Sequence, residues 1–529
     1  MKLEKVVVIT AVIVGTLAVA ACVWLNMGEQ KTDAEQNEST TLDWYVNFSW
    51  FHGNWGENLV SKAITDQTDV SVRFSSPSGN ESEKLDALIN ANALPDLITL
   101  GCWEPQVQEM IDKNMVYAYN ELAGKYDSQF WEVADEKALK WYTNEDGNVY
   151  CYPNSFYTPQ DLETYHNISS NETFLVRKDI YEAIGSPDMS TQEGFEAAVK
   201  KAVELYPQVD GRPLIPIGAH VFDNMGCVSF DKYLMDFLAV PMEKDGEIYD
   251  RYTDPEYLSW LKFFRRLGEE GYLAPDIFVD TRTQMDEKIG QGRYFCMMYQ
   301  YTDILDQQKS LAAENPERIY IAVDGPGNSR GEDPRLSVNG MNGWTVTLIS
   351  RKCKDPEKAI KFVEYLISEK GQMETYLGTE GVTYEVVDGK VVLNPEVQEL
   401  LNTDRKAYDE KYGADYCYWM FQDLTMPLKY PQETPDYVSQ LKEWSWPYAA
   451  YAGQYDYQPT QKIKDSAMYD ELNQLWGETL PSLLLADSDE EFDRIVSEAV
   501  VQREKMGFSK VQAEKTENMK RAKEKLDMR

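Results

Sequence analysis

The sequence contains few histidines that could act in catalysis or bind a metal ion. The three histidines, His52, His166 and His220, lie far apart and form no HxxxH or HExxH motif. A zinc site built on histidine and a Ser-His-Asp triad both need such residues with matched partners. We therefore expect no enzyme of these classes, and nothing in the sequence indicates a metal ion or a cofactor.

Aromatic side chains beside amides and acids offer a different chemistry, the binding of carbohydrate. The C–H faces of sugars stack on aromatic rings, while sugar hydroxyls need paired donors and acceptors. The chain holds 34 Tyr and 13 Trp, more than a core of Leu and Val requires. Many of these rings are therefore expected to line a binding surface.

The elements that position such rings alternate between strand and helix. The pattern predicts strands over 43–48, 70–74 and 94–100, the last beginning with a turn, and helices over 58–66 and 82–90. This order opens a parallel α/β sheet, and ligands of such sheets bind beyond the carboxyl ends of the strands. Two loops expected at those ends, 49–55 and 101–104, are unusually aromatic.

Trp103 is the first candidate for ligand contact, because it follows a predicted buried strand in a loop, and local packing is its alternative. Trp50 and Trp55 follow the first strand with Asn54 as a polar partner, although one of these tryptophans could instead wedge between lobes. The full set of candidate ligand-binding residues is Trp50, Asn54, Trp55, Trp103, Tyr152, Asn154, Tyr299, Gln300, Tyr301, Asp303, Asn342 and Trp344.

The later candidates carry stronger structural alternatives. Residues 299–303 follow a predicted strand over 294–298, so half of their side chains should point inward by strand alternation. Tyr152 and Asn154, with Tyr157, are expected where the chain crosses between lobes, and hinge packing explains them equally well. Three further tryptophans, Trp419, Trp444 and Trp446, are expected to serve core or interlobe packing.

The N-terminus has the pattern of an export signal. Lys2 and Lys5 precede an uncharged apolar stretch over 6–25. The stretch is long enough for an uncleaved anchor helix, which is the alternative. The residues Val19-Ala20-Ala21-Cys22 resemble a bacterial lipoprotein box, which implies a signal peptide over 1–21 and lipidation of Cys22. A polar tether is then expected over 22–41.

Charge and length restrict the remaining possibilities. The 529 residues exceed what one hydrophobic core usually covers, so two lobes or more are expected. With a net charge of −37, the surface repels a phosphate backbone, and nucleic acid is excluded as a partner. The six cysteines after Cys22 form no CxxC motif, so disulfides and buried free thiols both remain open.

Several segments together resemble a known family. The run LDALINANALPDLITL (residues 85–100) is similar to a helix-turn-strand segment of the extracellular solute-binding proteins of ABC importers, specifically their carbohydrate-binding group and its large lipoprotein branch. Asn92-Ala93-Leu94 departs from the usual glycine-containing turn of that family. Further similar segments follow in the family's order, at 147–157, 173–185, 289–304, 342–368 and 377–391 and near the C-terminus.

The resemblance implies a two-lobed α/β fold of the periplasmic-binding-protein type (type II), with hinge strands between the lobes and a helix-rich C-terminal part. We expect 42–155 and 322–350 in lobe 1, and 156–321 and 351–529 in lobe 2. The implied function is a monomeric cell-surface lipoprotein that captures an oligosaccharide and delivers it to an ABC transporter permease, held to the membrane through Cys22. The alternatives are a secreted glycoside hydrolase and a binding protein for a non-sugar solute.

Overall fold

The computed structural model describes residues 39–387, 390–413, 417–431, 434–456 and 466–528. The predicted signal peptide, Cys22 and the predicted tether up to residue 38 lie outside these ranges. Over the ranges that are described, no helix combines the length and the apolar character needed to cross a membrane.

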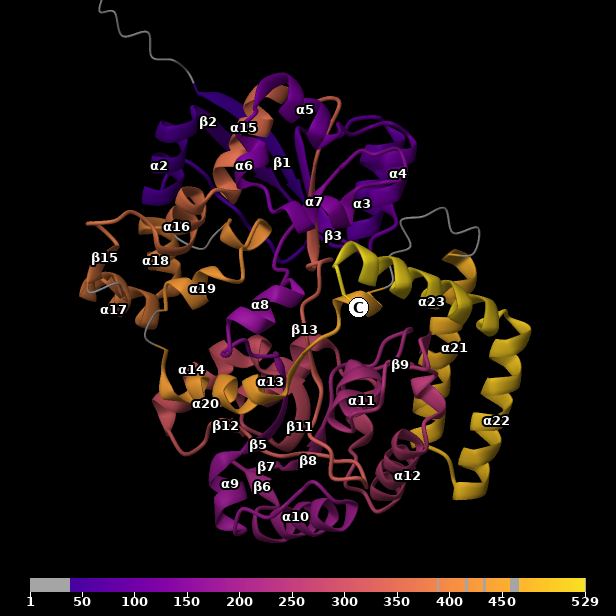
Figure 1. Cartoon of the computed structure of the whole chain (residues 1–529). Coiled ribbons are helices and arrows are strands. Elements are labelled where there is room, and N and C mark those ends of the chain that lie inside the picture. The colour runs from indigo at the N-terminus through magenta and orange to yellow at the C-terminus, as the bar shows by residue number, and fades with distance from the viewer. Residues whose placement is uncertain (1–38, 388–389, 414–416, 432–433, 457–465, 529) are drawn as a thin grey trace, which may run out of the picture.

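The first lobe, at the top of Figure 1, is built on a five-stranded sheet with the order β2-β1-β3-β14-β4. Its strands are β1 (Thr40–Val46), β2 (Val70–Ser75), β3 (Leu97–Gly101), β4 (Tyr152–Pro153) and β14 (Thr345–Ile349). β1 pairs in parallel with both β2 and β3, so Trp44 lies opposite Phe74 and Leu97. β14 runs antiparallel to β3 and β4.

Two helices connect these parallel strands, which confirms the predicted opening. Asn58 starts α2 (Leu59–Thr68) because its side chain accepts a hydrogen bond from Ser61 N at 2.8 Å, as an N-cap does. Asn80 caps α3 (Glu81–Asn90) in the same way. The remaining helices of this stretch are α4 (Gln106–Asp112), α5 (Tyr119–Tyr126), α6 (Phe130–Val133) and α7 (Glu136–Tyr142).

Both faces of the first sheet are buried. Because strand side chains alternate, Trp44 of β1 enters one apolar core and its neighbour Tyr45 enters the core on the opposite face. The indole Nε1 of Trp44 donates to Thr99 Oγ1 at 2.8 Å, and Thr99 is hydrogen-bonded to Thr347 at 2.7 Å. These buried polar groups are therefore satisfied within the sheet.

The second lobe is built on a four-stranded sheet with the order β12-β5-β11-β8. Its strands are β5 (Glu172–Arg177), β8 (Ile215–Gly218), β11 (Tyr294–Gln300) and β12 (Tyr320–Ala322), and its helices are α9 (Lys178–Ala183), α10 (Gln192–Leu205), α11 (Leu234–Phe237), α12 (Pro255–Glu269), α13 (Arg282–Gly290) and α14 (Leu305–Glu314). Two short hairpins, β6–β7 (Gln208–Val209 with Arg212–Pro213) and β9–β10 (Glu243–Lys244 with Glu247–Ile248), extend from it.

Extended segments join the lobes, and Figure 1 shows them between the two bodies. The chain passes from β4 through α8 (Pro159–Thr164) into the second sheet, and it returns from β12 through β13 (Leu336–Val338) to β14. β13 pairs in parallel with β17 (Ala449–Tyr451), which belongs to a later crossing. The lobes are thus connected more than once, as the resemblance implied.

The predicted boundary after Ser350 is wrong for residues 356–421. The helix α15 (Pro356–Ile367) buries Ile360 and Phe362 in the same core as Trp44, on the first sheet. The physical reason is that β14 ends in the first lobe, and an amphipathic helix that follows directly can fold back onto that sheet. The first lobe also takes α16 (Glu369–Leu377), α17 (Pro395–Thr403) and α18 (Arg405–Lys411), while a hairpin, β15 (Tyr384–Val387) with β16 (Lys390–Leu393), projects from this region.

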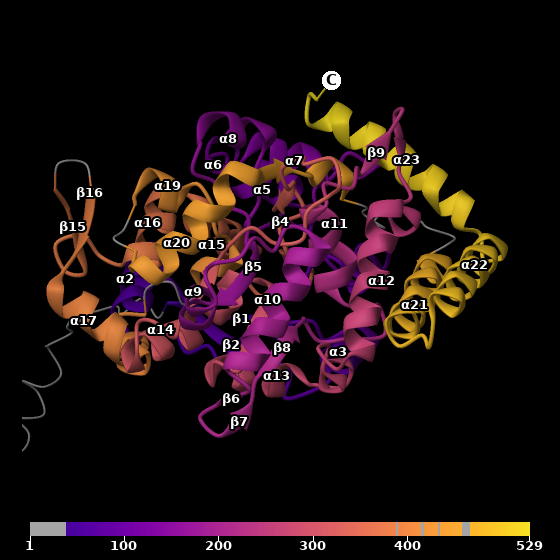
Figure 2. The same ribbon diagram turned by 90° about the horizontal axis from the view of Figure 1, so that it is seen from below.

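The predicted helix-rich C-terminal part is present and belongs mainly to the second lobe. After α19 (Met426–Lys429), the helix α20 (Asp436–Ser445) buries Leu441 in a second-lobe core. The last three helices, α21 (Ser466–Leu484), α22 (Asp489–Lys505) and α23 (Phe508–Lys525), gather at one side of the molecule (Figures 1 and 2). We call these three the C-terminal helical unit.

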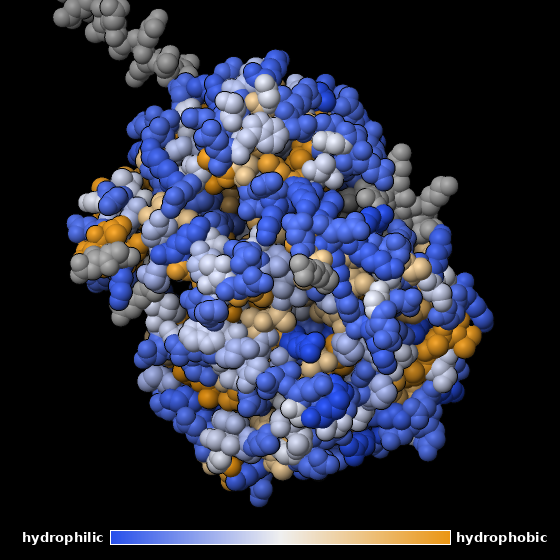
Figure 3. All heavy atoms as spheres, viewed as in Figure 1, coloured by the Kyte–Doolittle hydropathy of each residue, from blue (hydrophilic) through white to orange (hydrophobic). Residues whose placement is uncertain are grey.

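The last helix also reaches the first lobe. Ala522 of α23 and Leu526, which directly follows the helix, are buried among first-lobe residues, and Lys525 Nζ donates to the backbone oxygen of Trp141 at 2.6 Å. On the second-lobe side, Thr516 Oγ1 accepts from Ile248 N at 3.0 Å. The surface seen in Figure 3 is mainly hydrophilic, as a net charge of −37 leads one to expect.

Candidate functional site

A cavity of about 530 Å³ lies between the lobes, and we call it the interlobe cavity. From the first lobe, Cys102 lines it just after β3, and Asn342 lines it just before β14. From the second lobe, Gln300 lines it at the carboxyl end of β11. The cavity therefore lies where parallel α/β sheets bind their ligands.

A second interlobe cavity, of about 670 Å³, opens beside the first. Tyr301 and Tyr157 line it, as does Trp446 from the segment that follows α20. Val338 and Asn339, at the end of β13, line both cavities. The hinge strand thus lies between two hollows, and together they offer room for an extended ligand.

Trp103 directly follows Cys102, which lines the interlobe cavity, and 61% of its surface is exposed. Its ring covers Gly101, where a Cβ atom would come within 2.7 Å of the indole. Glu104, the next residue, accepts from Gly101 N at 2.7 Å and from Asn47 Nδ2 at 2.5 Å. The loop is therefore fixed at its base while the Trp103 ring is free for contact, so a core role for this side chain is excluded.

Trp50 and Trp344 meet in an aromatic cluster with Trp419. The rings of Trp344 and Trp419 are stacked with centroids 5.1 Å apart, and Trp50 lies 5.2 Å from Trp419. Phe48 closes the cluster at 5.4 Å from both Trp50 and Trp344. Trp50 is 56% exposed, so this cluster presents an indole to solvent. Trp419 was expected to pack, and it does so against the candidate residues themselves.

Three candidates serve the framework of the first lobe or project from it. Trp55 packs against Phe362 and donates through Nε1 to Thr65 at 2.9 Å, so it belongs to the core. Tyr152 is also buried there, and its hydroxyl accepts from Asp135 N at 3.1 Å. Asn54 is exposed on its loop. None of these three side chains lines either interlobe cavity.

Asn154 is a hinge residue. Its side chain is fully buried and accepts from the backbone nitrogens of Trp344 at 3.1 Å and Thr345 at 2.8 Å. Its Nδ2 donates to the backbone oxygen of Trp419 at 2.6 Å. Asn154 therefore ties the first crossing to β14 and to the aromatic cluster, in agreement with the alternative of hinge packing.

In the second lobe, strand alternation separates Tyr299 from Gln300 at the end of β11, whereas Tyr301 and Asp303 lie on a 3-10 turn, η4 (Tyr301–Ile304). Tyr299 is fully buried, whereas Gln300 lines the interlobe cavity and accepts from Tyr233 OH at 2.8 Å. Tyr301 lines the second cavity, and Asp303 is paired with Arg282 at 2.9 Å. Gln300 and Tyr301 are therefore placed for ligand contact.

Sequence reasoning missed a group of polar residues that line the interlobe cavity. Lys232 and Tyr233 lie on a single π-helical turn, η1 (Ser229–Tyr233), and Arg251 follows the β9–β10 hairpin. Asp456 lies beyond β17. None of them stands in a motif or next to a predicted strand end, so only the fold brings them together.

Burial changes the acidity of several carboxyl groups around this region. Burial raises the pKa of Asp456 to about 7, and Lys232 opposes the rise. Asp231 also has a pKa raised to about 7 by burial, although Trp476 donates to it at 2.6 Å. Glu104 behaves in the same way, with its pKa raised to about 7 by burial. Carboxyl groups that are partly protonated near neutrality can donate as well as accept hydrogen bonds, which suits sugar hydroxyls.

The cysteines provide no disulfide in the described part of the chain. Cys102, Cys151, Cys227, Cys296 and Cys353 are thiols, which resolves the question that the sequence left open. Burial raises the pKa of the Cys102 thiol to about 12, so it is not a reactive thiolate. Within the same described ranges, no group of three His, Cys, Asp or Glu side chains is arranged to hold a metal ion.

Comparison with known proteins shows which family has this architecture. A family model described as bacterial extracellular solute-binding protein matches residues 60–399. The polygalacturonan/rhamnogalacturonan-binding protein YtcQ of Bacillus subtilis (strain 168) is 19% identical over 414 residues, which are 74% of this chain and 76% of YtcQ. Lipoprotein LipO of the same organism is 22% identical over 352 residues, covering 62% of this chain and 64% of LipO.

Solved structures show the same fold at low identity. The S. pneumoniae ABC-transporter substrate-binding protein FusA, in complex with kestose, aligns with a TM-score of 0.68 at 17% identity over 91% of this chain and 99% of FusA. The alginate-binding protein AlgQ2, solved without calcium ion, aligns with a TM-score of 0.64 at 16% identity over 91% of this chain and 98% of AlgQ2. The predicted two-lobed α/β fold is confirmed. Because the family model covers more than half of its residues, this chain belongs to the bacterial extracellular solute-binding protein family.

Proposed function

We propose that this protein is a cell-surface lipoprotein that captures an oligosaccharide between its lobes and delivers it to the permease of an ABC transporter, without catalysing a reaction. One observation carries the proposal: the interlobe cavity is lined from both lobes by amides and charged groups, and the exposed Trp103 directly follows Cys102, which lines it. The ligands printed for relatives, polygalacturonan for YtcQ and kestose for FusA, support a carbohydrate. A sugar surface with many hydroxyls matches this lining.

We further propose Trp103, Trp50, Trp344, Gln300, Tyr301 and Asn342 as ligand-contacting residues, joined by Lys232, Tyr233, Arg251 and Asp456. Asn342 accepts from Trp141 Nε1 at 2.8 Å, which fixes its side chain at the wall of the cavity. The exposed rings supply surfaces on which sugar rings stack. The polar groups supply hydrogen bonds that orient the sugar hydroxyls. We propose that the protein acts as a monomer, because the family resemblance gives no role to a second copy.

A ligand bound between two lobes is expected to stabilise the protein and to make it more compact. A ligand shifts a conformational equilibrium only through unequal affinity for the two states, so it must make contacts in the closed form that the open form lacks. At a hundredfold excess over Kd, such a ligand adds about 2.7 kcal/mol to the free energy of unfolding. Thermal-shift screening of fructo-, malto-, xylo- and galacturono-oligosaccharides measures the first effect, and small-angle scattering with the best binder measures the second.

The thermal-shift and scattering measurements together distinguish capture by lobe closure from binding without closure. A raised Tm with a smaller radius of gyration supports capture by lobe closure. A raised Tm with unchanged dimensions keeps the carbohydrate assignment and rejects the hinge mechanism. Release of reducing ends from any of these glycans by the purified protein would reject the binding-protein assignment in favour of a hydrolase.

Anchoring is tested at Cys22. The thiol is the acyl acceptor of the inferred lipoprotein box, so Cys22→Ala is expected to leave a precursor of uncleaved length. The variant should also no longer fractionate with lipid-labelled membrane protein. Metabolic labelling with an alkyne fatty acid reports the acyl group directly, and Cys102→Ala serves as the control. Wild-type migration and labelling of Cys22→Ala would show that the residue is not lipidated.

A further inference from the structure

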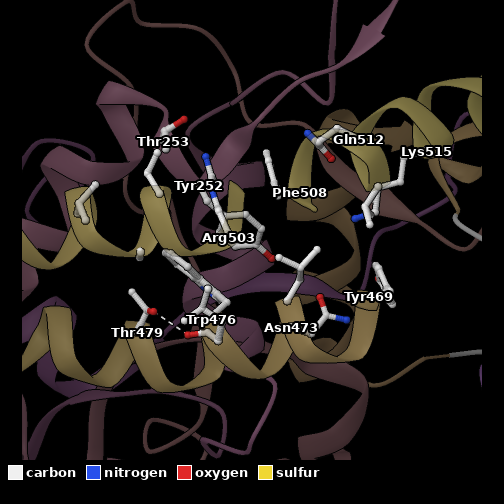
Figure 4. A pocket seen from close by; sticks show the side chains of 16 residues that line it. Tyr252, Thr253, Tyr469, Asn473, Trp476, Thr479, Arg503, Phe508, Gln512 and Lys515 are labelled. Atoms are coloured by element: carbon white, nitrogen blue, oxygen red, sulfur yellow. Dashed lines mark hydrogen bonds between the residues drawn. The ribbon is translucent and has the colours of Figure 1, made fainter. Parts of the chain in front are cut away.

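The last helix, α23, is fixed at its N-terminal end in the C-terminal helical unit. Figure 4 shows this end beside α21 and α22, where Phe508, Gln512 and Lys515 line a pocket of about 110 Å³ among the three helices. The guanidinium of Arg503 lies 3.9 Å from the centre of the Phe508 ring, and the Lys515 ammonium lies 4.9 Å from the centre of the Tyr469 ring. These contacts attach the first turns of α23 to the second lobe.

The middle of α23 packs against the β9–β10 hairpin of the second lobe. Thr516 Oγ1 accepts from Ile248 N at 3.0 Å, and Lys523 Nζ lies 2.6 Å from Glu243 Oε2. The same carboxylate oxygen accepts from Tyr455 OH at 3.0 Å, in the 3-10 turn that follows the crossing strand β17. The helix therefore runs beside a crossing between the lobes while the second lobe still holds it.

The C-terminal end of α23 is docked on the first lobe. Ala522 and Leu526 are buried in the first-lobe core that also contains Trp141. Lys525 Nζ donates to the backbone oxygen of Trp141 at 2.6 Å, in the last turn of α7. A lysine in this position satisfies a carbonyl that the helix leaves free, and its charge opposes the helix dipole. We call residues 522–528 the tip of α23.

Geometry makes α23 a link of fixed length between the lobes, and Figure 1 shows it at the level where they meet. From Thr516 on the second-lobe side to Lys525 on the first-lobe side, the helix spans about 14 Å at 1.5 Å per residue. Backbone hydrogen bonds close each turn, so this length does not stretch. A rotation that changes the distance between these two contact points must therefore break one of the attachments.

The attachment to the first lobe is the weaker of the two. It depends on the apolar contacts of Ala522 and Leu526 and on the hydrogen bonding of Lys525. The ion pair of Lys140 with Asp527, at 3.2 Å, joins exposed side chains and contributes little. The attachment to the second lobe combines its contacts with the covalent connection to α22. The tip is therefore the end that releases first.

From these contacts we propose that α23 is a strap between the lobes, which holds them in the arrangement of this structure and whose tip must leave α7 before the lobes can rotate apart. The docked tip adds contacts to one lobe arrangement only, so it shifts the conformational equilibrium as a bound ligand does. The inference goes beyond the proposed function, because it concerns the lobes without ligand and does not depend on which solute binds.

The test measures the distance between the lobes in the sugar-free protein. A donor dye and an acceptor dye are attached through non-natural amino acids at position 84, exposed on α3, and position 204, exposed on α10. Single-molecule energy transfer then gives the distribution of distances. The wild-type protein should show one dominant population.

Two variants release the tip in different ways. Leu526→Asp places a charge where a side chain that is 4% exposed now packs, and removal of residues 525–529 deletes the docking side chains. Each should raise the population of other lobe arrangements, relative to the dominant one, about tenfold or more. This is the factor expected when the burial of one leucine is lost.

Ala513→Asp is the matched control, because residue 513 is exposed on the same helix and receives the same charge. Hydrogen exchange over the tip confirms its release, and melting curves confirm that each variant is folded. A distance distribution that matches wild type in the truncated protein would overturn the inference, because the lobes would then keep their arrangement without the strap. If the distances respond to both variants while no sugar binds, the inference stands and the proposed function fails. If sugars bind and compact the protein while the truncated protein keeps the wild-type distances, the proposed function stands and the inference fails.

Discussion

Asp236→Asn is expected to lower the free energy of unfolding by about 3 kcal/mol, because it leaves the largely buried guanidinium of Arg251 without its carboxylate. Asp236 is 1% exposed and is paired with Arg251 at 2.5 Å. Its second oxygen accepts from Ser337 Oγ at 2.8 Å, on the hinge strand β13. The substitution keeps the size and this hydrogen bond and removes only the charge.

A second ion pair, between Lys232 and Glu172, lies near Asp236 and limits the expected loss of stability. Lys232 Nζ lies 2.6 Å from Glu172 Oε1, whose side chain is fully buried. Burial raises the pKa of Glu172, and Asp236 raises it further, while Lys232 opposes the rise. When the charge of Asp236 is removed, Glu172 ionises more readily, which strengthens its pair with Lys232. We therefore expect the lower end of the range known for broken buried ion pairs.

Urea denaturation at pH 7 measures the change, with Asp306→Asn on the exposed face of α14 as the control, for which we expect less than about 0.5 kcal/mol. The double variant Asp236→Leu/Arg251→Met removes both charges and should recover most of the loss, since an apolar pair of similar volume is often neutral. A loss under about 1 kcal/mol for Asp236→Asn would show that this contact does not hold the hinge strand.

The strand-helix order of the first lobe could be predicted because its signals are local. Residues 97–101 are entirely buried and apolar except for Thr99, and asparagines at 58 and 80 stand where the helices begin. The lobe boundaries after Ser350 could not be predicted in this way. An amphipathic helix such as α15 shows which of its faces is buried, but its sequence does not show which of two sheets will cover it.

The candidate site was predictable where a strand end marks it. Gln300 and Tyr301 follow β11, and Trp103 follows β3, so chain position indicated each of them. Lys232, Arg251 and Asp456 reach the cavity from a π-helical turn, a hairpin and a segment beyond β17. Their proximity depends on contacts between distant segments, which spacing along the chain does not encode. Trp55 was predicted to contact the ligand, but it packs against the core of the first lobe. An aromatic residue in a loop can turn inward onto its own lobe, and its position in the sequence does not show this.

Trp103→Ala is expected to weaken binding of the cognate oligosaccharide about thirtyfold, since an aromatic anchor at an interface commonly contributes about 2 kcal/mol or more. The melting temperature without ligand should barely change. Trp103 is 61% exposed and rests on Gly101, so its removal leaves no cavity in a core. The loop also keeps its shape, because Glu104 still accepts from Gly101 N and from Asn47.

Calorimetry with the best binder of the screen measures the affinity, and Trp131→Ala is the matched control. Trp131 is 46% exposed in the first lobe on α6, which contributes no residue to either interlobe cavity, whereas Trp103 directly follows the cavity residue Cys102. Its replacement should therefore leave Kd unchanged. Intact affinity in Trp103→Ala would remove this residue from the site and make the cluster of Trp50, Trp344 and Trp419 the stacking surface instead. In that case Trp50→Ala should show the thirtyfold loss, because Trp50 is the ring of that cluster that is 56% exposed.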